Sequence, residues 1–252
     1  CFQTQKAPFD DPRVRKAFSL AIDRTYIVNQ VTQSGQVEAG GFVPSGVYDA
    51  DGADGDDFRT VGGDYYKPTD ADYEANCDEA RQLLADAGYP NGEGFPVVEY
   101  LYNTSDAHKA VAEALQFMWE EELGVKVTLN NQEWAAFLQT RKDGDYSIAR
   151  NGWIADYNDP ISFLDMWMTG GGNNDAQYAN DDYDALIKQA KTTTDNAERM
   201  DLLHQAEDKL IGEDNVLAPL YFYTQKYMLA DGIEGMYYCP LGYFFFGYTH
   251  QA

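Results

Sequence analysis

The segment from residue 150 to residue 160, Arg-Asn-Gly-Trp-Ile-Ala-Asp-Tyr-Asn-Asp-Pro, gathers a cation, an indole, a carboxylate and a phenol into a few positions. We expect a strand over residues 146–151 to lead into it, and loops that follow strands commonly hold ligands. Asp156 has the clearest chemistry, because a lone carboxylate can form a charge-assisted hydrogen bond with the ammonium group of a small ligand. The same residue could instead form an Asx turn or cap the helix that we expect to start near residue 160.

The side chains around Asp156 also fit two roles each. Arg150 could receive an anionic group of a ligand, or it could pair with one of the many carboxylates of this acidic chain. Trp153 could be a core residue, but its position after the strand favours the wall of a site. Asp159 fits a helix cap, with Pro160 at the first helical position, where a missing N–H leaves no hydrogen bond unmade.

The composition is that of a globular and strongly acidic protein. The 252 residues are 44% hydrophobic, which is enough for one large domain or two small ones with a hydrophobic core. No apolar run approaches the roughly 18 residues that cross a bilayer. With 42 acidic and 18 basic residues the net charge is −24. This charge argues against binding to nucleic acid or to a bare anionic membrane.

No motif of the sequence predicts an enzyme. His108, His204 and His250 are far apart along the chain, and none belongs to an H-E-x-x-H pair. Neither a G-x-S-x-G nucleophile motif nor a phosphate-binding P-loop occurs in the sequence. Pairs of carboxylates carry no information in a chain with 42 acidic residues. We therefore expect a protein that binds without doing chemistry and that needs no cofactor.

The cysteines and the acidic clusters predict no metal site. Cys1, Cys77 and Cys239 form no C-x-x-C motif, and nothing in the sequence supports a disulfide between Cys77 and Cys239. The acidic run 49–57 fails the EF-hand pattern, because Ala53 stands at a ligand position and an aspartate replaces the required glycine. We expect a solvated acidic loop there.

The apolar pattern predicts alternating strands and helices. Strands are expected over 97–102, 125–129, 146–151 and 216–222, and helices over 12–30, 74–87, 105–124, 132–141, 161–168, 182–191 and 195–212. A long loop is expected over 34–72. The order strand, helix, strand, helix, strand in the middle predicts an α/β fold with helices packed on a sheet. The aromatic residues near the end are expected to pack and not to bind a ligand.

Four stretches of the chain resemble the peptide-binding group of ABC-transporter substrate-binding proteins, the oligopeptide- and dipeptide-binding lipoproteins. They are PFDDPRVRKAFSLAIDR (8–24), ARQLLADAGYPNGEGFP (80–96), RNGWIADYNDPISFLDMW (150–167) and the stretch 199–223, which ends in VLAPLYFY. Together they span nearly the whole chain in the order that the family has.

This resemblance implies the C-terminal lobe of a two-lobed, periplasmic-binding-protein-like fold, an α/β lobe with a mixed sheet flanked by helices. Family members are about twice as long, so an amino-terminal lobe with the signal peptide and the lipidated cysteine is expected to be missing. That expectation weakens a lipid-anchor role for Cys1. Residues 1–222 would form the ligand-binding lobe. Residues 223–252 would be a segment after the hinge that packs on the missing lobe.

The resemblance also implies roles for single residues. Asp156 would pair with the α-ammonium group of a peptide, Arg150 would help to receive its carboxylate end, and Trp153 would line a side-chain pocket. Ile154 stands where some members have a disulfide-forming cysteine, so that disulfide is not expected here. The expected ligand-binding set is completed by Tyr157, Tyr221 and Tyr223.

The implied function is the capture of oligopeptides outside the cytoplasm, in the periplasm or at the cell surface, and their delivery to the membrane permease of an ABC importer. The lipid anchor would lie outside this chain. A related branch of the family carries nickel, so a nickel- or small-solute-binding protein is an alternative, although the chain offers no histidine cluster for a bare ion. A sensor or adhesion module that kept the fold and lost the ligand is another.

Overall fold

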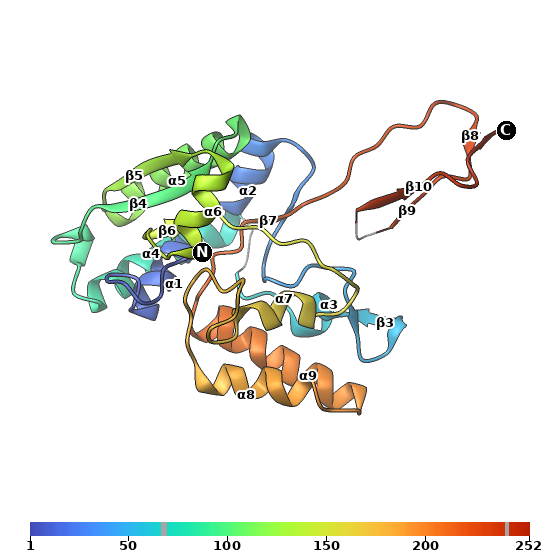
Figure 1. The fold of residues 1–252 in the computed structure, drawn as a ribbon. Coiled ribbons are helices and arrows are strands. Elements are labelled where there is room, and N and C mark those ends of the chain that lie inside the picture. Colours follow the sequence, from blue (N-terminus) through green and yellow to red (C-terminus); the bar gives the residue numbers. More distant parts are fainter. Residues whose placement is uncertain (67–69, 240–241) are drawn as a thin grey trace.

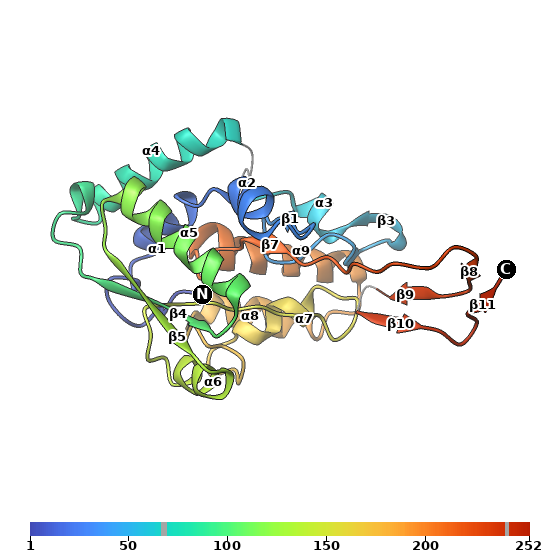
Figure 2. The same ribbon diagram turned by 90° about the horizontal axis from the view of Figure 1, so that it is seen from above.

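The computed structural model describes residues 1–66, 70–239 and 242–252. These residues form a body of two parts and an arm (Figure 1). One part holds the main sheet and its helices, and the other is a group of helices at the opposite end of the body. The arm is the C-terminal segment, which extends away from both parts (Figure 2). Residues 67–69, in the expected loop 34–72, and residues 240–241, in the expected segment 223–252, lie outside the described residues.

The main sheet has three strands, β4 (Val98–Asn103) in the centre, β5 (Val127–Gln132) on one side and β6 (Ile148–Ala149) on the other. Both pairings are parallel: Val98 lies opposite Val127, and Tyr100 lies opposite Ile148. Phe2 adds an antiparallel bridge to Ile148, which makes the sheet mixed at this edge. The mixed α/β class expected from the sequence is therefore confirmed.

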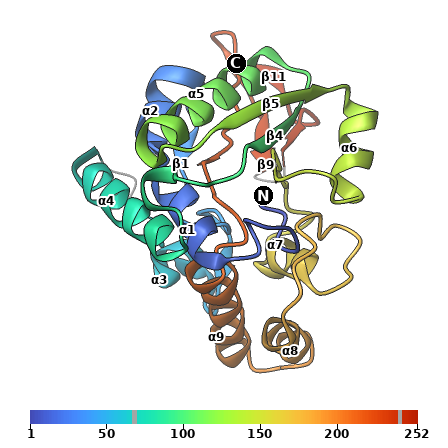
Figure 3. The same ribbon diagram turned by 90° about the vertical axis from the view of Figure 1, so that its left-hand side faces the viewer.

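Two helices connect the strands of this sheet and lie on opposite faces of it (Figures 2 and 3). They are α5 (Asp106–Leu123), between β4 and β5, and α6 (Trp134–Lys142), between β5 and β6. Ser105 caps α5 with its side chain, and Gly124 ends it in the left-handed region at φ 66°. The buried face of α5 carries Val111, Leu115 and Trp119. Because these local signals are strong, the sequence predicts both ends of α5 correctly.

Aromatic side chains join α1 (Pro12–Leu20) to the sheet part of the core. The ring of Phe18 lies 5.0 Å from that of Phe9 and 5.2 Å from that of Trp119. The indole nitrogen of Trp119 donates a hydrogen bond to the carbonyl of Phe18 at 2.8 Å. A buried indole that keeps a hydrogen-bond partner adds its large apolar surface to the core without leaving a polar group unpaired.

The second part of the body is mainly helical. Its longest helices are α8 (Asp181–Ala190) and α9 (Asn196–Glu207). They lie side by side at the end of the body farthest from α5 (Figure 3). Shorter turns are α7 (Ile161–Leu164), η3 (Asp165–Trp167) and η4 (Asp208–Glu213). The remaining helices of the described chain are α2 (Arg24–Tyr26), η1 (Ile27–Thr32), α3 (Phe58–Gly62), α4 (Asp70–Asp86) and η2 (Pro90–Gly92). No helix in the described ranges is long and apolar enough to cross a membrane.

Asp195 begins α9, as the sequence predicts, and its side chain accepts a hydrogen bond from the backbone N–H of Glu198 at 3.0 Å. Asp195→Ala leaves that N–H without a side-chain partner and should lower the free energy of unfolding by about 0.5–2 kcal/mol. Asp195→Asn is the matched control, because an amide oxygen caps as well as a carboxylate. Urea unfolding of the three proteins measures the difference. Equal losses for both variants would show that the cap contributes little.

Several predicted elements differ from the structure. The helix expected over 12–30 ends at Leu20, because Asp23 caps a new turn by accepting from the backbone N–H of Tyr26 at 2.7 Å. The loop expected over 34–72 contains β1 (Val37–Glu38), α3 and a hairpin of β2 (Tyr48–Asp49) with β3 (Gly52–Asp57). The sequence did not predict this hairpin, because its run of aspartates is rare in strands.

Three other predicted elements are shorter than expected. The strand predicted over 146–151 is reduced to Ile148–Ala149, and the helix predicted over 161–168 becomes the short turns α7 and η3. In the strand predicted over 216–222, only β7 (Tyr221–Phe222) pairs, antiparallel with β1. Val216 and Leu217 are buried but lie outside any strand. The apolar run therefore correctly predicted that these residues are buried, but it wrongly predicted that all of them pair in a strand.

The arm consists of two antiparallel pairs, β9 (Tyr237–Cys239) with β10 (Tyr243–Phe245), and β8 (Ile233–Glu234) with β11 (His250–Gln251). Its large apolar side chains are exposed, for example Met228 at 97% and Tyr248 at 79%. Rings contact one another within the arm, such as Tyr237 and Phe245 at 4.6 Å. All three cysteines are free, including Cys77 and Cys239.

Candidate functional site

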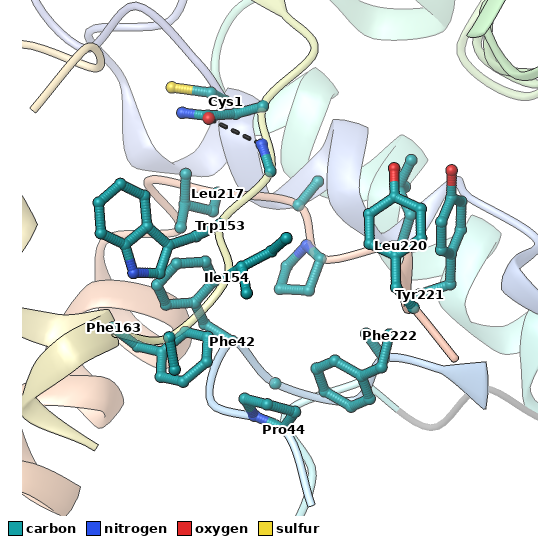
Figure 4. Close-up of a pocket in the computed structure, with 18 of the residues that line it drawn as sticks. Cys1, Phe42, Pro44, Trp153, Ile154, Phe163, Leu217, Leu220, Tyr221 and Phe222 are labelled. Atoms are coloured by element: carbon teal, nitrogen blue, oxygen red, sulfur yellow. Dashed lines mark hydrogen bonds between the residues drawn. The ribbon is translucent and has the colours of Figure 1, made fainter. Parts of the chain in front are cut away.

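A cavity of about 550 Å³ lies beside the end of β6, where the sheet part meets the helical part. Three segments form most of its wall: the loop after β6, the stretch 41–48 and the stretch 217–223. Figure 4 shows their side chains around the open space, with Phe42 and Pro44 from the second segment and Leu217 and Tyr221 from the third. The candidate loop found in the sequence is therefore one wall of a cavity.

The loop 150–160 is held at its start by the sheet and by a neighbouring arginine. The backbone N–H of Arg150 donates to the carbonyl of Leu101 at 2.8 Å, which continues the pairing of β6 with β4. Arg141, on α6, donates to the carbonyl of Arg150 at 3.2 Å and to the side-chain oxygen of Asn151 at 3.1 Å. An ion pair of Arg141 with Asp175, at 2.7 Å, fixes that guanidinium in turn.

The far end of the loop is fixed by Asn158 and Asp159. Asn158 accepts from the backbone N–H of Tyr48 at 2.8 Å and donates to the carbonyl of Gly46 at 3.0 Å, so it joins two walls of the cavity. Asp159 forms two hydrogen bonds with Arg199, at 2.8 and 2.9 Å. It also accepts from the backbone N–H of Ile161 at 2.9 Å, although the helix begins one residue later than predicted, with Pro160 at the N-cap position. The stretch between these anchors is thus presented in a defined shape.

Asp156 lies on this stretch and is exposed. Its backbone N–H donates to the hydroxyl of Ser162 at 3.0 Å, but no residue of the described chain donates to its carboxylate. It is not one of the residues that line the cavity, although its neighbours Ala155 and Tyr157 are. A carboxylate without a partner remains free to meet a cation that approaches from solvent.

Arg150 lines the cavity at the start of the loop. Its guanidinium donates to the hydroxyl of Tyr223 at 3.3 Å, and no carboxylate of the described residues lies within 4.0 Å of it. In this chain of net charge −24, five other arginines of the described residues do pair with a carboxylate. The structural alternative, an ion pair that only holds the fold together, therefore has no support for Arg150 among the described residues.

His108, which is not among the site residues predicted from the sequence, lies next to Arg150 in the cavity wall. Burial lowers the pKa of His108, and the positive charge of Arg150 lowers it further. His108 stands in the first turn of α5, directly after β4, while Arg150 follows β6. Because β4 and β6 are parallel neighbours, their carboxyl ends place both residues at one edge of the sheet. Knowledge of this strand order would have been needed to predict His108 as a site residue.

The predicted tyrosines lie on two sides of the cavity. Tyr221 is in β7, half-buried, and its ring meets that of Tyr223 edge to face at 5.4 Å. Burial raises the pKa of Tyr221, and the neighbouring Tyr223 raises it further. Tyr157 is 50% exposed and stands at the rim. Of the predicted set, the structure brings Arg150, Trp153 and these three tyrosines to one cavity, and places Asp156 outside it.

Aromatic side chains form the deeper wall. Trp153 is partly buried, and in Figure 4 it lies above Phe42 and Phe163. The rings of Phe42 and Phe163 meet edge to face at 5.8 Å. Ile154, the next residue of the loop, is 71% exposed and lies toward the open space. The loop thus offers one indole for packing and one free aliphatic side chain.

The wall 41–48 is supported from behind by Glu207, the last residue of α9, which is fully buried. Its carboxylate accepts from the backbone N–H groups of Phe42 and Val43, both at 2.8 Å, and pairs with Arg59 at 2.8 and 2.9 Å. A side chain at Gly41 would overlap the guanidinium of Arg59. This support comes from segments far apart in the sequence, so no local pattern predicted it.

Within the described ranges, no group of three or more His, Cys, Asp or Glu side chains could hold a metal ion. The lining of the cavity supplies hydrogen-bond donors, aromatic faces and one guanidinium. Such a lining can bind an organic ligand with a carboxylate and apolar parts.

An α/β lobe that presents a cavity at the carboxyl ends of parallel strands is typical of a protein that binds a ligand there. The family described as bacterial extracellular solute-binding proteins, family 5 middle, matches residues 1–175, and the chain belongs to this family. Its members bind solutes and are not enzymes.

Relatives and solved structures agree with this assignment. The chain is 38% identical to the dipeptide-binding protein DppE of Bacillus subtilis over 96% of its own length and 43% of the relative's, and 38% identical to the periplasmic oligopeptide-binding protein OppA of Salmonella typhimurium over 92% and 40%. Haemophilus influenzae OppA in complex with the peptide RPPGFSPFR superposes with a TM-score of 0.79 at 30% identity, over 93% of this chain and 44% of that one. The chain thus spans less than half the length of these relatives.

Proposed function

We propose that this chain is one lobe of a protein that binds oligopeptides and delivers them to the permease of an ABC importer. The observation that carries the proposal is a pair of charges on one loop that have no oppositely charged partner among the described residues, Arg150 in the cavity and Asp156 outside it. A peptide has a carboxylate and an ammonium group whatever its sequence. Arg150 and Asp156 are six positions apart, so their Cα atoms stand at most about 20 Å apart, the span of an extended peptide of about six residues.

The charges would act together with neighbouring groups. His108 lies beside Arg150 and can donate a further hydrogen bond to a carboxylate. Tyr223, already within 3.3 Å of the guanidinium, can do the same. Trp153 and Tyr221 would cover the side chains of the ligand, and Tyr157 would close the rim. The relatives named for binding dipeptides and oligopeptides support a peptide as the ligand.

A second lobe is part of the proposal. Asp156 and Ile154 are exposed, and a lobe that closes over this face would remove them from solvent. Residues 1–222 would then be the ligand-binding lobe, and 223–252 would pack on the opposing lobe, which accounts for exposed side chains such as Met228 and Tyr248. We place the whole protein outside the cytoplasm, tethered by a lipid anchor that lies beyond this chain.

Arg150→Gln tests the carboxylate end of the proposed site. In the full-length protein we expect a peptide with a free carboxylate to bind about ten-fold or more weakly to this variant, because the charge-assisted hydrogen bonds of the guanidinium are lost. The same peptide with an amidated C-terminus should bind both proteins equally. Isothermal titration of both peptides into both proteins gives the four affinities of a double-mutant cycle. An equal loss for the free and the amidated peptide would show that Arg150 does not contact the carboxylate.

A further inference from the structure

The lining of the cavity differs sharply from the composition of the chain. The sequence has 42 acidic residues in 252, yet no Asp or Glu lines the cavity among the residues that the structure describes. Lysine is absent from this lining as well, and the ionisable cationic side chains in it are Arg150 and His108. An acidic protein has therefore kept one hollow free of carboxylates. A lining without acidic residues in an acidic protein indicates which ligand groups the cavity binds and which it excludes.

Most of the remaining wall is apolar and closely packed. The ring of Phe42 meets those of Phe163 and Trp167 edge to face, at 5.8 and 5.7 Å. Leu217 and Ile154 complete the space around them (Figure 4). Phe163 and Trp167 are 6% and 1% exposed, so their rings are fixed by the core behind them. A rigid wall of this kind gains most from a large apolar group that fills the space.

A cationic side chain would meet the opposite conditions in this space. A lysine ammonium group that entered it would lose its water shell and find no carboxylate in return. The guanidinium of Arg150 would repel it as well. An acidic side chain would compete with the ligand's own carboxylate for Arg150. A bulky apolar side chain has no charge, so it neither loses a charged group's water shell nor interacts unfavourably with Arg150.

We propose that the cavity selects a bulky apolar side chain of the bound peptide, such as Phe or Leu, and discriminates against Lys and Arg at that position. This inference rests on the proposed function and narrows its substrate class from oligopeptides in general to peptides with a large apolar residue at one position. Asp156 stays outside the cavity, so it recognises the ammonium group of the main chain without admitting a second cation to the hollow.

The test uses alanine hexapeptides with Phe, Leu, Lys or Glu placed in turn at each of the six positions, titrated into the full-length protein by calorimetry. At one position we expect the Phe and Leu peptides to bind at least ten-fold more tightly than the Lys peptide. Binding of the Lys peptides equal to or tighter than that of the Phe peptides at every position would overturn the inference while leaving peptide binding intact. No heat with any of the peptides would overturn the proposed function itself.

Ile154→Asp should change this preference. Because Ile154 is exposed, the variant should fold, and it places a carboxylate in the lining. The ratio of Phe-peptide to Lys-peptide affinity should fall by about ten-fold. Phe117→Asp is the matched control, since Phe117 is 65% exposed on α5 and lies outside the cavity lining, and its ratio should be unchanged. A ratio unaffected by Ile154→Asp, or one shifted equally by both variants, would contradict the selection of side chains by this cavity.

Discussion

Replacement of Glu207 by alanine is expected to lower the free energy of unfolding by about 3–5 kcal/mol. The carboxylate is fully buried and has four hydrogen bonds, two from backbone N–H groups of the cavity wall and two from Arg59. Without it, the guanidinium of Arg59, itself 6% exposed, keeps its charge in the interior and loses its strongest partner. The N–H groups of Phe42 and Val43 also lose their acceptor.

Urea unfolding with a common slope measures this loss. Glu207→Gln should lose less than Glu207→Ala, since the amide oxygen can still accept from Phe42 and Val43 while the ion pair is gone. Glu213→Ala is the surface control: its pair with Lys209 at 3.2 Å is exposed, so we expect a change within about 0.5 kcal/mol. A loss below about 1 kcal/mol for Glu207→Ala would mean that the wall 41–48 holds its shape without this carboxylate.

Structural features that depend on neighbouring residues follow from the sequence, whereas features that depend on distant residues do not. The helix starts expected at residues 12, 105 and 195 and the helix end expected at residue 124 agree with the structure to within one residue, because a cap depends on residues within one turn. The hairpin of β2 and β3 was missed, because its aspartates favour a loop and only pairing across the turn makes it a strand.

The same distinction applies to the site. The loop 150–160 was recognised whole, since its residues are contiguous. His108 reaches the cavity through the pairing of β4 with β6, and Glu207 reaches it through the packing of α9 behind the wall 41–48. For neither residue does the surrounding sequence contain a pattern that predicts a role in the site. Prediction of such residues requires the order of the strands and the positions of the helices, which a single sequence leaves open.

Asp156→Asn is expected to weaken the binding of peptides with a free ammonium group by about 2–5 kcal/mol in the full-length protein. The carboxylate has no partner among the described residues, so its role is not to hold the lobe together. Asparagine preserves the shape of the side chain and the backbone hydrogen bond to Ser162, so stability should change by less than about 0.5 kcal/mol. A loss of affinity without a loss of stability would assign the carboxylate to the ligand.

Acetylation of the peptide's N-terminus is the matched control for this substitution. An acetylated peptide has no ammonium group, so it should bind the wild-type protein and Asp156→Asn with similar affinity, and both should resemble the variant with the free peptide. Equal affinity of wild type and variant for the free peptide would instead show that Asp156 does not contact the ammonium group of the ligand. The outcome decides whether the loop binds the peptide at both ends, because Arg150 and Asp156 are then tested independently on opposite termini of one ligand.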